Sequence, residues 1–248
     1  MRALERALVI TGTLTLGLVV VVGVEILLAR LGDRLDPFPR ESLDGRIGGS
    51  GDTPLRIVWI GDSTGDGVGA STPDATLPRT FARGLDRPVD LRVLARSGAR
   101  TLDAIQTQLP ELAGLRPDWV VVGIGSNDVI HLTSLSDFRA QLDRLLQGVL
   151  ATEPDSVIVV GPGQFASTPR FAQPLRFIAG RRARALNRDA RQVAQAHGAV
   201  FVDIIERVGR FFVDDPARYH ARDDFHPSDA GYGLWARAAL DAVAGRPS

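Results

Sequence analysis

Residues 55–63 read LRIVWIGDS, an apolar run that ends in a Gly-Asp-Ser turn. Its β-branched and aromatic centre favours a strand, and its nearly continuous apolar character is typical of a parallel sheet covered on both faces. A serine on a tight turn after such a strand exposes its hydroxyl and holds a backbone N–H beside it, as a nucleophile requires. An isolated serine is more often a helix cap, so Ser63 needs partners elsewhere in the chain.

Four further apolar runs follow at fairly even spacing, and helix-like segments separate them. The predicted strands are Arg56–Ile60, Asp90–Ala95, Trp119–Ile124, Val157–Val160 and Val200–Ile204. The predicted helices are Thr76–Leu85, Leu102–Leu112, Ser136–Leu150, Pro174–His197 and Ser228–Ala244. This alternation predicts an α/β fold: a three-layer α/β/α sandwich around a five-stranded parallel sheet, spanning residues 55–248.

Ligands of such sheets bind beyond the carboxyl ends of the strands, and polar or flexible residues follow three of the predicted strands. They are Ser63, Gly98 in Ser97-Gly98-Ala99, and Asn127 in Gly125-Ser126-Asn127-Asp128. Near the C-terminus stands Asp223-Asp224-Phe225-His226. A carboxylate three residues before a histidine can hold the imidazole in one tautomer, so that His226 could take a proton from Ser63.

Taken together and in this order, these four blocks resemble those of the SGNH (GDSL-like) hydrolases, from about Leu55 to Ala244. The resemblance implies a flavodoxin-like sandwich and an esterase that needs no metal or cofactor. It implies that Ser63 is the nucleophile, His226 the general base and Asp223 the orienting acid. The N–H groups of Ser63 and Gly98 and the side chain of Asn127 would form the oxyanion hole.

The chain departs from the family pattern at two points. The second block of the family often has Asn and Gly before its key glycine, whereas this chain has Val93-Leu94-Ala95-Arg96. The Asp223-Asp224 doublet leaves open which carboxylate orients His226, although spacing favours Asp223. Gly161–Gly180, which carries several aromatic residues and prolines, is either a wall of the acyl pocket or an ordinary connection.

The N-terminal segment is predicted to be a membrane helix. Ala7–Val24 contains no charge and is followed by Glu25, a length that can span a bilayer. We expect an uncleaved anchor over residues 1–30 with an extracytoplasmic enzyme domain, or a secreted protein if the segment is cleaved. Residues 31–54, rich in Gly, Pro and Asp, are expected to form a flexible linker.

Other classes of function fit less well. The formal net charge is zero, which argues against nucleic-acid binding, and the absence of cysteine excludes thiolate chemistry. Gly65–Ala70 fits a dinucleotide-binding pattern but opens no helix directly. A zinc site built from His220, Asp223, Asp224 and His226 would leave Ser63 and Asn127 without roles. An acyltransferase with the same chemistry and an inactive envelope binding protein remain alternatives.

The tether suggests ester substrates at a membrane surface, such as acylated lipids or O-acylated glycans.

Overall fold

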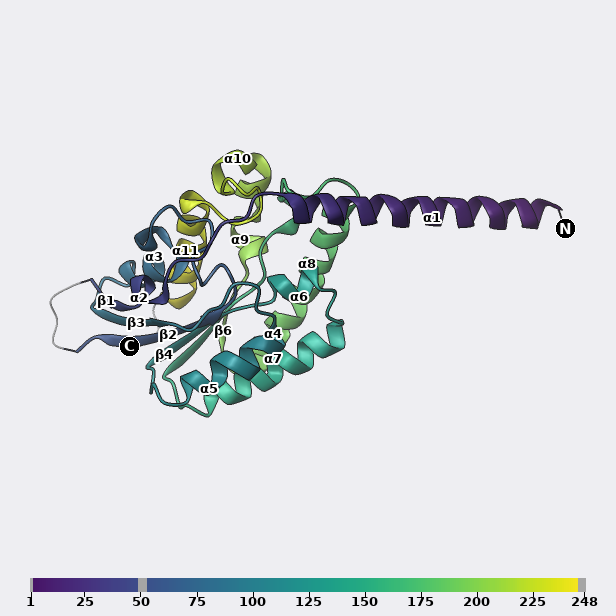
Figure 1. Cartoon of the computed structure of the whole chain (residues 1–248). Helices are drawn as coiled ribbons and strands as arrows, with labels where there is room; N and C mark the ends of the chain where they lie inside the picture. The colour runs from purple at the N-terminus through teal and green to yellow at the C-terminus, as the bar shows by residue number, and fades with distance from the viewer. Residues whose placement is uncertain (1, 49–52, 245–248) are drawn as a thin grey trace.

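The computed structural model describes residues 2–48 and 53–244. A mixed sheet of six strands has the order β1-β3-β2-β4-β5-β6. Its strands are β1 (Gly45–Ile47), β2 (Leu55–Gly61), β3 (Val89–Val93), β4 (Trp119–Gly123), β5 (Ser156–Val160) and β6 (Val200–Val202). All five predicted strands are present and mutually parallel, and Figure 1 shows helices on both sides of the sheet.

The predicted all-parallel, five-stranded sheet is corrected by β1, which pairs antiparallel with β3 at the sheet edge. This strand comes from the segment predicted as a linker, which also contains the short helix α2 (Arg40–Leu43). Leu43 and Ile47 are buried in the core, and the Asp44 carboxylate accepts a hydrogen bond from Val93 N–H at 2.8 Å. A run of three residues that begins with Gly45 and is followed by Gly48 is too short to show strand periodicity. The linker residues 49–52 lie outside the described residues.

Alternate residues of each central strand enter two separate cores. Ile57 and Trp59 of β2 face one core together with α3 (Leu77–Arg83), α9 (Ile204–Asp214) and α11 (Asp229–Val243). Val58 and Ile60 face the other core, with α7 (Leu135–Leu150) and α8 (Leu175–Ala196). Successive side chains of a strand point to opposite faces of the sheet, so these apolar strands need helices on both faces to bury them. The sandwich therefore has the predicted three layers.

Shorter elements shape the connections between the strands. The predicted helix at 102–112 consists of α4 (Thr101–Asp103), a π-helical turn η2 (Ala104–Gln108) and α5 (Leu109–Leu112). The remaining elements are η1 (Pro73–Ala75), α6 (Ser126–Ile130), η3 (Phe165–Ser167) and α10 (Pro216–Tyr219). The fifth strand ends at Val202, earlier than predicted, because Asp203 caps α9 by accepting a hydrogen bond from Glu206 N–H.

The N-terminal helix α1 (Arg2–Leu31) projects from the domain (Figure 1). Its stretch Thr11–Ala29 is long and apolar enough to cross a membrane. The end of α1 contacts the domain: Glu25 accepts a hydrogen bond from Leu175 N–H, and the Ala29 carbonyl accepts one from Arg170 Nε.

Candidate active site

Ser63 lies on a tight turn directly after β2. The turn is held by Asp62, whose carboxylate accepts hydrogen bonds from the Thr64 backbone N–H at 3.0 Å and the Thr64 hydroxyl at 2.9 Å. Before the turn, the buried Gln108 side chain bonds both the N–H and the carbonyl of Gly61, each at 2.8 Å. Gln108 thus fixes the strand end from which Ser63 projects. Sequence reasoning missed it, since the contact joins residues 47 positions apart.

The glycines of the loop after Ser63 have a packing role. A Cβ at Gly69 would lie 2.4 Å from the Pro227 carbonyl oxygen and 2.9 Å from the Cβ of His226. Gly69 also has a φ of +98°, which L side chains rarely adopt. Gly69 therefore lets the serine loop pack against the segment that carries His226. The loop leads to η1 and not directly into a long helix, as a dinucleotide-binding loop would.

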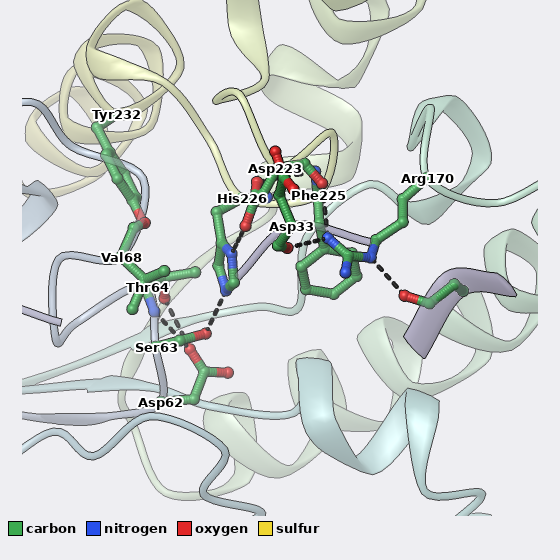
Figure 2. A network of polar contacts seen from close by, with 11 residues as sticks. Asp33, Asp62, Ser63, Thr64, Val68, Arg170, Asp223, Phe225, His226 and Tyr232 are labelled. Carbon is green, nitrogen blue, oxygen red and sulfur yellow. Dashed lines mark hydrogen bonds and ion pairs between the residues drawn. The ribbon is translucent and has the colours of Figure 1, made fainter. Parts of the chain in front are cut away.

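Asp223, His226 and Ser63 form one chain of hydrogen bonds (Figure 2). The Asp223 carboxylate lies 2.6 Å from His226 Nδ1, and His226 Nε2 lies 2.9 Å from Ser63 Oγ. The other carboxylate oxygen of Asp223 accepts the backbone N–H groups of His226 and Phe225. This geometry allows the imidazole to take a proton from the serine hydroxyl.

The two carboxylates of the Asp223-Asp224 doublet have different positions. Asp223 contacts His226, whereas Asp224 has a left-handed backbone with a φ of +57° and accepts the Arg170 backbone N–H through its carbonyl. The Arg170 guanidinium also donates to the Asp223 carbonyl at 2.8 Å (Figure 2). The same guanidinium donates to the carbonyls of Ala29 and Asp33. Arg170 therefore joins the end of α1 to the loop of Asp223, a link that no local sequence pattern signals.

Gly98 and Asn127 lie together at the ends of β3 and β4. The Asn127 side-chain amide donates to the Ala99 carbonyl at 3.1 Å, which leaves its second N–H for another acceptor. Gly98 has a φ of +81°, and a Cβ there would meet nothing within 4 Å. The Asp66 carboxylate of the serine loop accepts the N–H and hydroxyl of Ser97. The serine loop and the Gly98 turn are thus tied to each other.

The pKa values of the two carboxyl groups beside Ser63 and His226 are shifted in opposite directions. For Asp62, full burial dominates over the Thr64 hydrogen bonds and raises the pKa to about 6. For Asp223, burial acts to raise the pKa, but the hydrogen bond and charge of His226 and the two backbone N–H groups together lower it. Asp223 is therefore held ionised beside the imidazole.

A pocket borders Ser63 and His226. Its other lining residues are Thr64, Ser126, Gly163, Gln164, Phe165, Thr168, Phe212, His220, Phe225, Pro227 and Trp235. Four of them come from the Gly161–Gly180 segment, which therefore contributes a pocket wall. Of the aromatic residues noted in that segment, Phe165 lines the pocket, and Phe171 packs against both Phe165 and Phe225.

The other histidines have separate contacts. His131 bonds the Asn127 carbonyl, and His197 bonds Asp143. His220 bonds the Pro216 carbonyl, and burial lowers its pKa. Within residues 2–48 and 53–244, no group of three or more histidine and acidic side chains is arranged to hold a metal ion.

Three solved structures with similar folds support the architecture. An alpha/beta hydrolase enzyme from the metagenome of Lake Arreo, Spain, has a TM-score of 0.62 and 24% identity, over 82% of this chain and 98% of that one. An acetylxylan esterase from Geobacillus stearothermophilus, a catalytic mutant, has a TM-score of 0.59 and 22% identity, over 81% and 97%. A lipase/acylhydrolase from Enterococcus faecalis has a TM-score of 0.60 and 20% identity, over 78% and 98%.

No protein of curated function matches the sequence significantly. The model of the GDSL-like lipase/acylhydrolase family, however, matches residues 59–234, a range that contains Ser63, Gly98, Asn127, Asp223 and His226. The match covers well over half of the chain. The chain therefore belongs to the GDSL-like lipase/acylhydrolase family and is an ester-hydrolysing enzyme.

Proposed function

We propose that the protein is a membrane-tethered serine hydrolase that cleaves carboxylic esters or thioesters through Ser63, His226 and Asp223. The observation that carries the proposal is the continuous hydrogen-bonded chain from Asp223 through His226 to Ser63 Oγ. The tether is α1, whose apolar stretch is long enough to cross a bilayer. The enzyme domain lies on the extracytoplasmic side in this proposal.

The reaction begins when Ser63 Oγ attacks the ester carbonyl while His226 Nε2 takes the hydroxyl proton. The charge on the carbonyl oxygen is stabilised by the N–H groups of Ser63 and Gly98 and by the free N–H of Asn127. His226 then gives its proton to the leaving alcohol, which leaves the acyl group on Ser63. A water molecule, deprotonated by His226, releases the acid and restores the serine. Asp223 orients the imidazole and stabilises its charged form.

The test is turnover of a panel of p-nitrophenyl esters, from acetyl to long acyl, by the full chain in detergent. Ser63→Ala should abolish turnover and labelling by a fluorophosphonate probe, and a chelator should leave turnover unchanged. No turnover and no labelling of the unaltered chain would contradict the proposal and favour a binding protein. Labelling without hydrolysis, with acyl transfer to an added alcohol, would identify an acyltransferase instead.

Asp223→Asn and Asp224→Asn form a matched pair that tests the orienting acid. Asp223→Asn should lower kcat by roughly 10,000-fold, because the amide cannot stabilise the charged imidazole or hold the correct tautomer. Asp224→Asn should change kcat little, because Asp224 contacts Arg170 through its backbone and asparagine tolerates a left-handed φ. Equal losses in both variants would refute the assignment of Asp223.

A further inference from the structure

Charged residues bound the apolar part of α1, and its length matches the hydrocarbon core of a bilayer. Residues 7–24 carry no charge and lie between Arg6 and Glu25. At 1.5 Å per residue, these 18 residues span about 27 Å, close to the thickness of a bilayer's hydrocarbon core, about 30 Å. In a bilayer whose hydrocarbon core is crossed by residues 7–24, Glu25 lies at the boundary between hydrocarbon and headgroups.

The domain reaches down to this boundary. Glu25 is only 8% exposed, and its carboxylate accepts the backbone N–H of Leu175, the first residue of α8, at 2.8 Å. A carboxylate at a helix N-terminus satisfies a free N–H and interacts favourably with the helix dipole. Because Leu175 is bonded to Glu25, α8 begins at the depth where the apolar part of α1 ends. Arg170 makes a second attachment through the Ala29 and Asp33 carbonyls.

Exposed apolar side chains gather on the same edge of the domain. Phe177 and Ile178, in the first turn of α8, are 55% and 40% exposed, and Leu132, in the turn between α6 and α7, is 68% exposed. Arg182 joins that turn to α8 by donating to the Val129 and Thr133 carbonyls. Figure 1 shows the α6–α7 turn and the start of α8 on the side of the domain from which α1 projects. We call this set the apolar edge: Ile130, Leu132, Leu135, Phe177 and Ile178.

Positive charge lies next to the apolar edge. The Arg181 guanidinium lies 5.8 Å from the centre of the Phe177 ring. Arg181, Arg184 and Arg188 are exposed and follow Phe177 at helical spacing, so they form one stripe along α8. Arginines beside an aromatic residue at a membrane boundary can cover apolar surface with their stems while their guanidinium groups reach the polar headgroups.

We propose that the apolar edge is seated in the interfacial layer of the bilayer that α1 crosses, so that the domain is docked on the membrane in one orientation. The proposal rests on the proposed function for the membrane insertion of α1. Thr168 lines the pocket beside Ser63 and precedes Leu175, the first residue of α8, by seven residues. The chain segment that forms the pocket wall therefore leads directly into the apolar edge. In this orientation the substrates are esters of amphiphilic molecules that reside in the membrane.

The docking is tested by fluorescence quenching in the full chain, placed in nanodiscs of phosphatidylcholine and phosphatidylglycerol. The chain has no cysteine, so Phe177→Cys, Leu132→Cys, Val20→Cys and Leu150→Cys each offer one labelling site for an environment-sensitive dye. Leu150 is the matched control because it is exposed at the far end of α7, about 22 Å along the helix from Leu135. Nitroxide-bearing lipids should quench dyes at positions 20, 132 and 177 but not at position 150.

The outcomes separate the two proposals. If the dye at position 20 is quenched while those at 132 and 177 behave as at 150, α1 is inserted and the docking is refuted. If the dye at position 20 is not quenched, the tether itself fails, and the docking fails with it.

A second measurement addresses the substrate class. The double variant Phe177→Ser/Ile178→Ser should lose roughly tenfold in turnover of an ester held in the nanodisc, since these apolar contacts with lipid are removed. Its turnover of p-nitrophenyl acetate in solution should be unchanged. Equal rates on the nanodisc-held ester for the variant and the unaltered chain would overturn the assignment of substrate class.

Discussion

Asp62 lies directly before Ser63, and the cost of its burial should be measurable as a pH dependence of stability. Its pKa is raised from 3.8 to about 6 in the folded protein, first by burial. Between these values the folded state binds more protons than the unfolded chain, so stability falls as the pH rises through this window. The loss amounts to roughly 3 kcal/mol at 1.36 kcal/mol per pKa unit.

Asp62→Asn should therefore abolish this loss, because an amide keeps an oxygen acceptor for Thr64 N–H without carrying a charge. We expect the Tm of the variant, measured in detergent between pH 4 and pH 8, to exceed that of the unaltered chain increasingly toward the upper end. Asp241→Asn, at an exposed position, is the control. A Tm difference that stays constant across the pH range would contradict this account.

The residues that supply the proposed chemistry could be named from the sequence, and the residues that hold them could not. Ser63, Asn127 and His226 stand in short blocks at strand ends, and Asp223 acts on a histidine three residues away. These residues can therefore be identified from the spacing of neighbouring residues in the sequence. Gln108 and Arg170 act across 47 and 53 residues, on Gly61 and Asp223 respectively. Any buried glutamine or surface arginine would look the same in the sequence, so only the folded chain identifies them.

At the scale of elements, the Arg170 contacts make the end of α1 a support for the loop of Asp223. A Cβ at Gly32 would lie 2.7 Å from the Arg170 guanidinium carbon. Gly32→Ala should therefore displace the flexible guanidinium from the Ala29, Asp33 and Asp223 carbonyls at little cost in stability. A displacement of about 1 Å at a reacting group can cost up to about 100-fold in rate, so we expect kcat to fall within that range while KM changes little.

Gly23→Ala is the matched control for this prediction, because a Cβ there meets nothing within 4 Å and the change lies in α1, nine residues before Gly32. Arg170→Lys should reproduce the loss of kcat, since an ammonium cannot reach three carbonyls in the guanidinium's fork geometry. The measurement is kcat and KM on p-nitrophenyl esters, with the Tm recorded for each variant. A fall in Tm with kcat unchanged would show that Arg170 serves stability alone.

The parallel strands and most of the long helices were predicted well, but the amphipathic helix α9 and the short elements held by a few contacts were not. The five parallel strands and the helices α3, α7, α8 and α11 lie within a few residues of their predicted bounds. The fifth strand was extended too far because Ile204 continues its apolar run, although Asp203 already caps α9. Strand β1 was missed because its three residues acquire a strand conformation only by pairing with β3.

At the scale of the whole molecule, β1 decides where the folded domain starts. The sequence placed that start near Leu55, but Leu43 is fully buried and Ile47 is 5% exposed in the core under α3. Burying a side chain of this size contributes about 1.5–3 kcal/mol, so removing both costs roughly 3–6 kcal/mol. Loss of β1 also leaves β3 as an unpaired edge, which favours aggregation.

Two truncated chains test this boundary, one starting at Leu35 and one at Leu55. Both lack α1 and its contacts with Arg170 and Leu175, so they differ only in the segment that contains α2 and β1. For a domain of about 200 residues, the expected loss of stability lowers the Tm by roughly 6 to 24 °C in the shorter chain. Differential scanning calorimetry measures the two Tm values, and size-exclusion chromatography detects association through the uncovered β3. Equal Tm values would show that residues 35–54 are a linker in the thermodynamic sense. The predicted difference would instead make β1 the true N-terminal strand of the enzyme domain, which leaves only a short connection between α1 and the sheet.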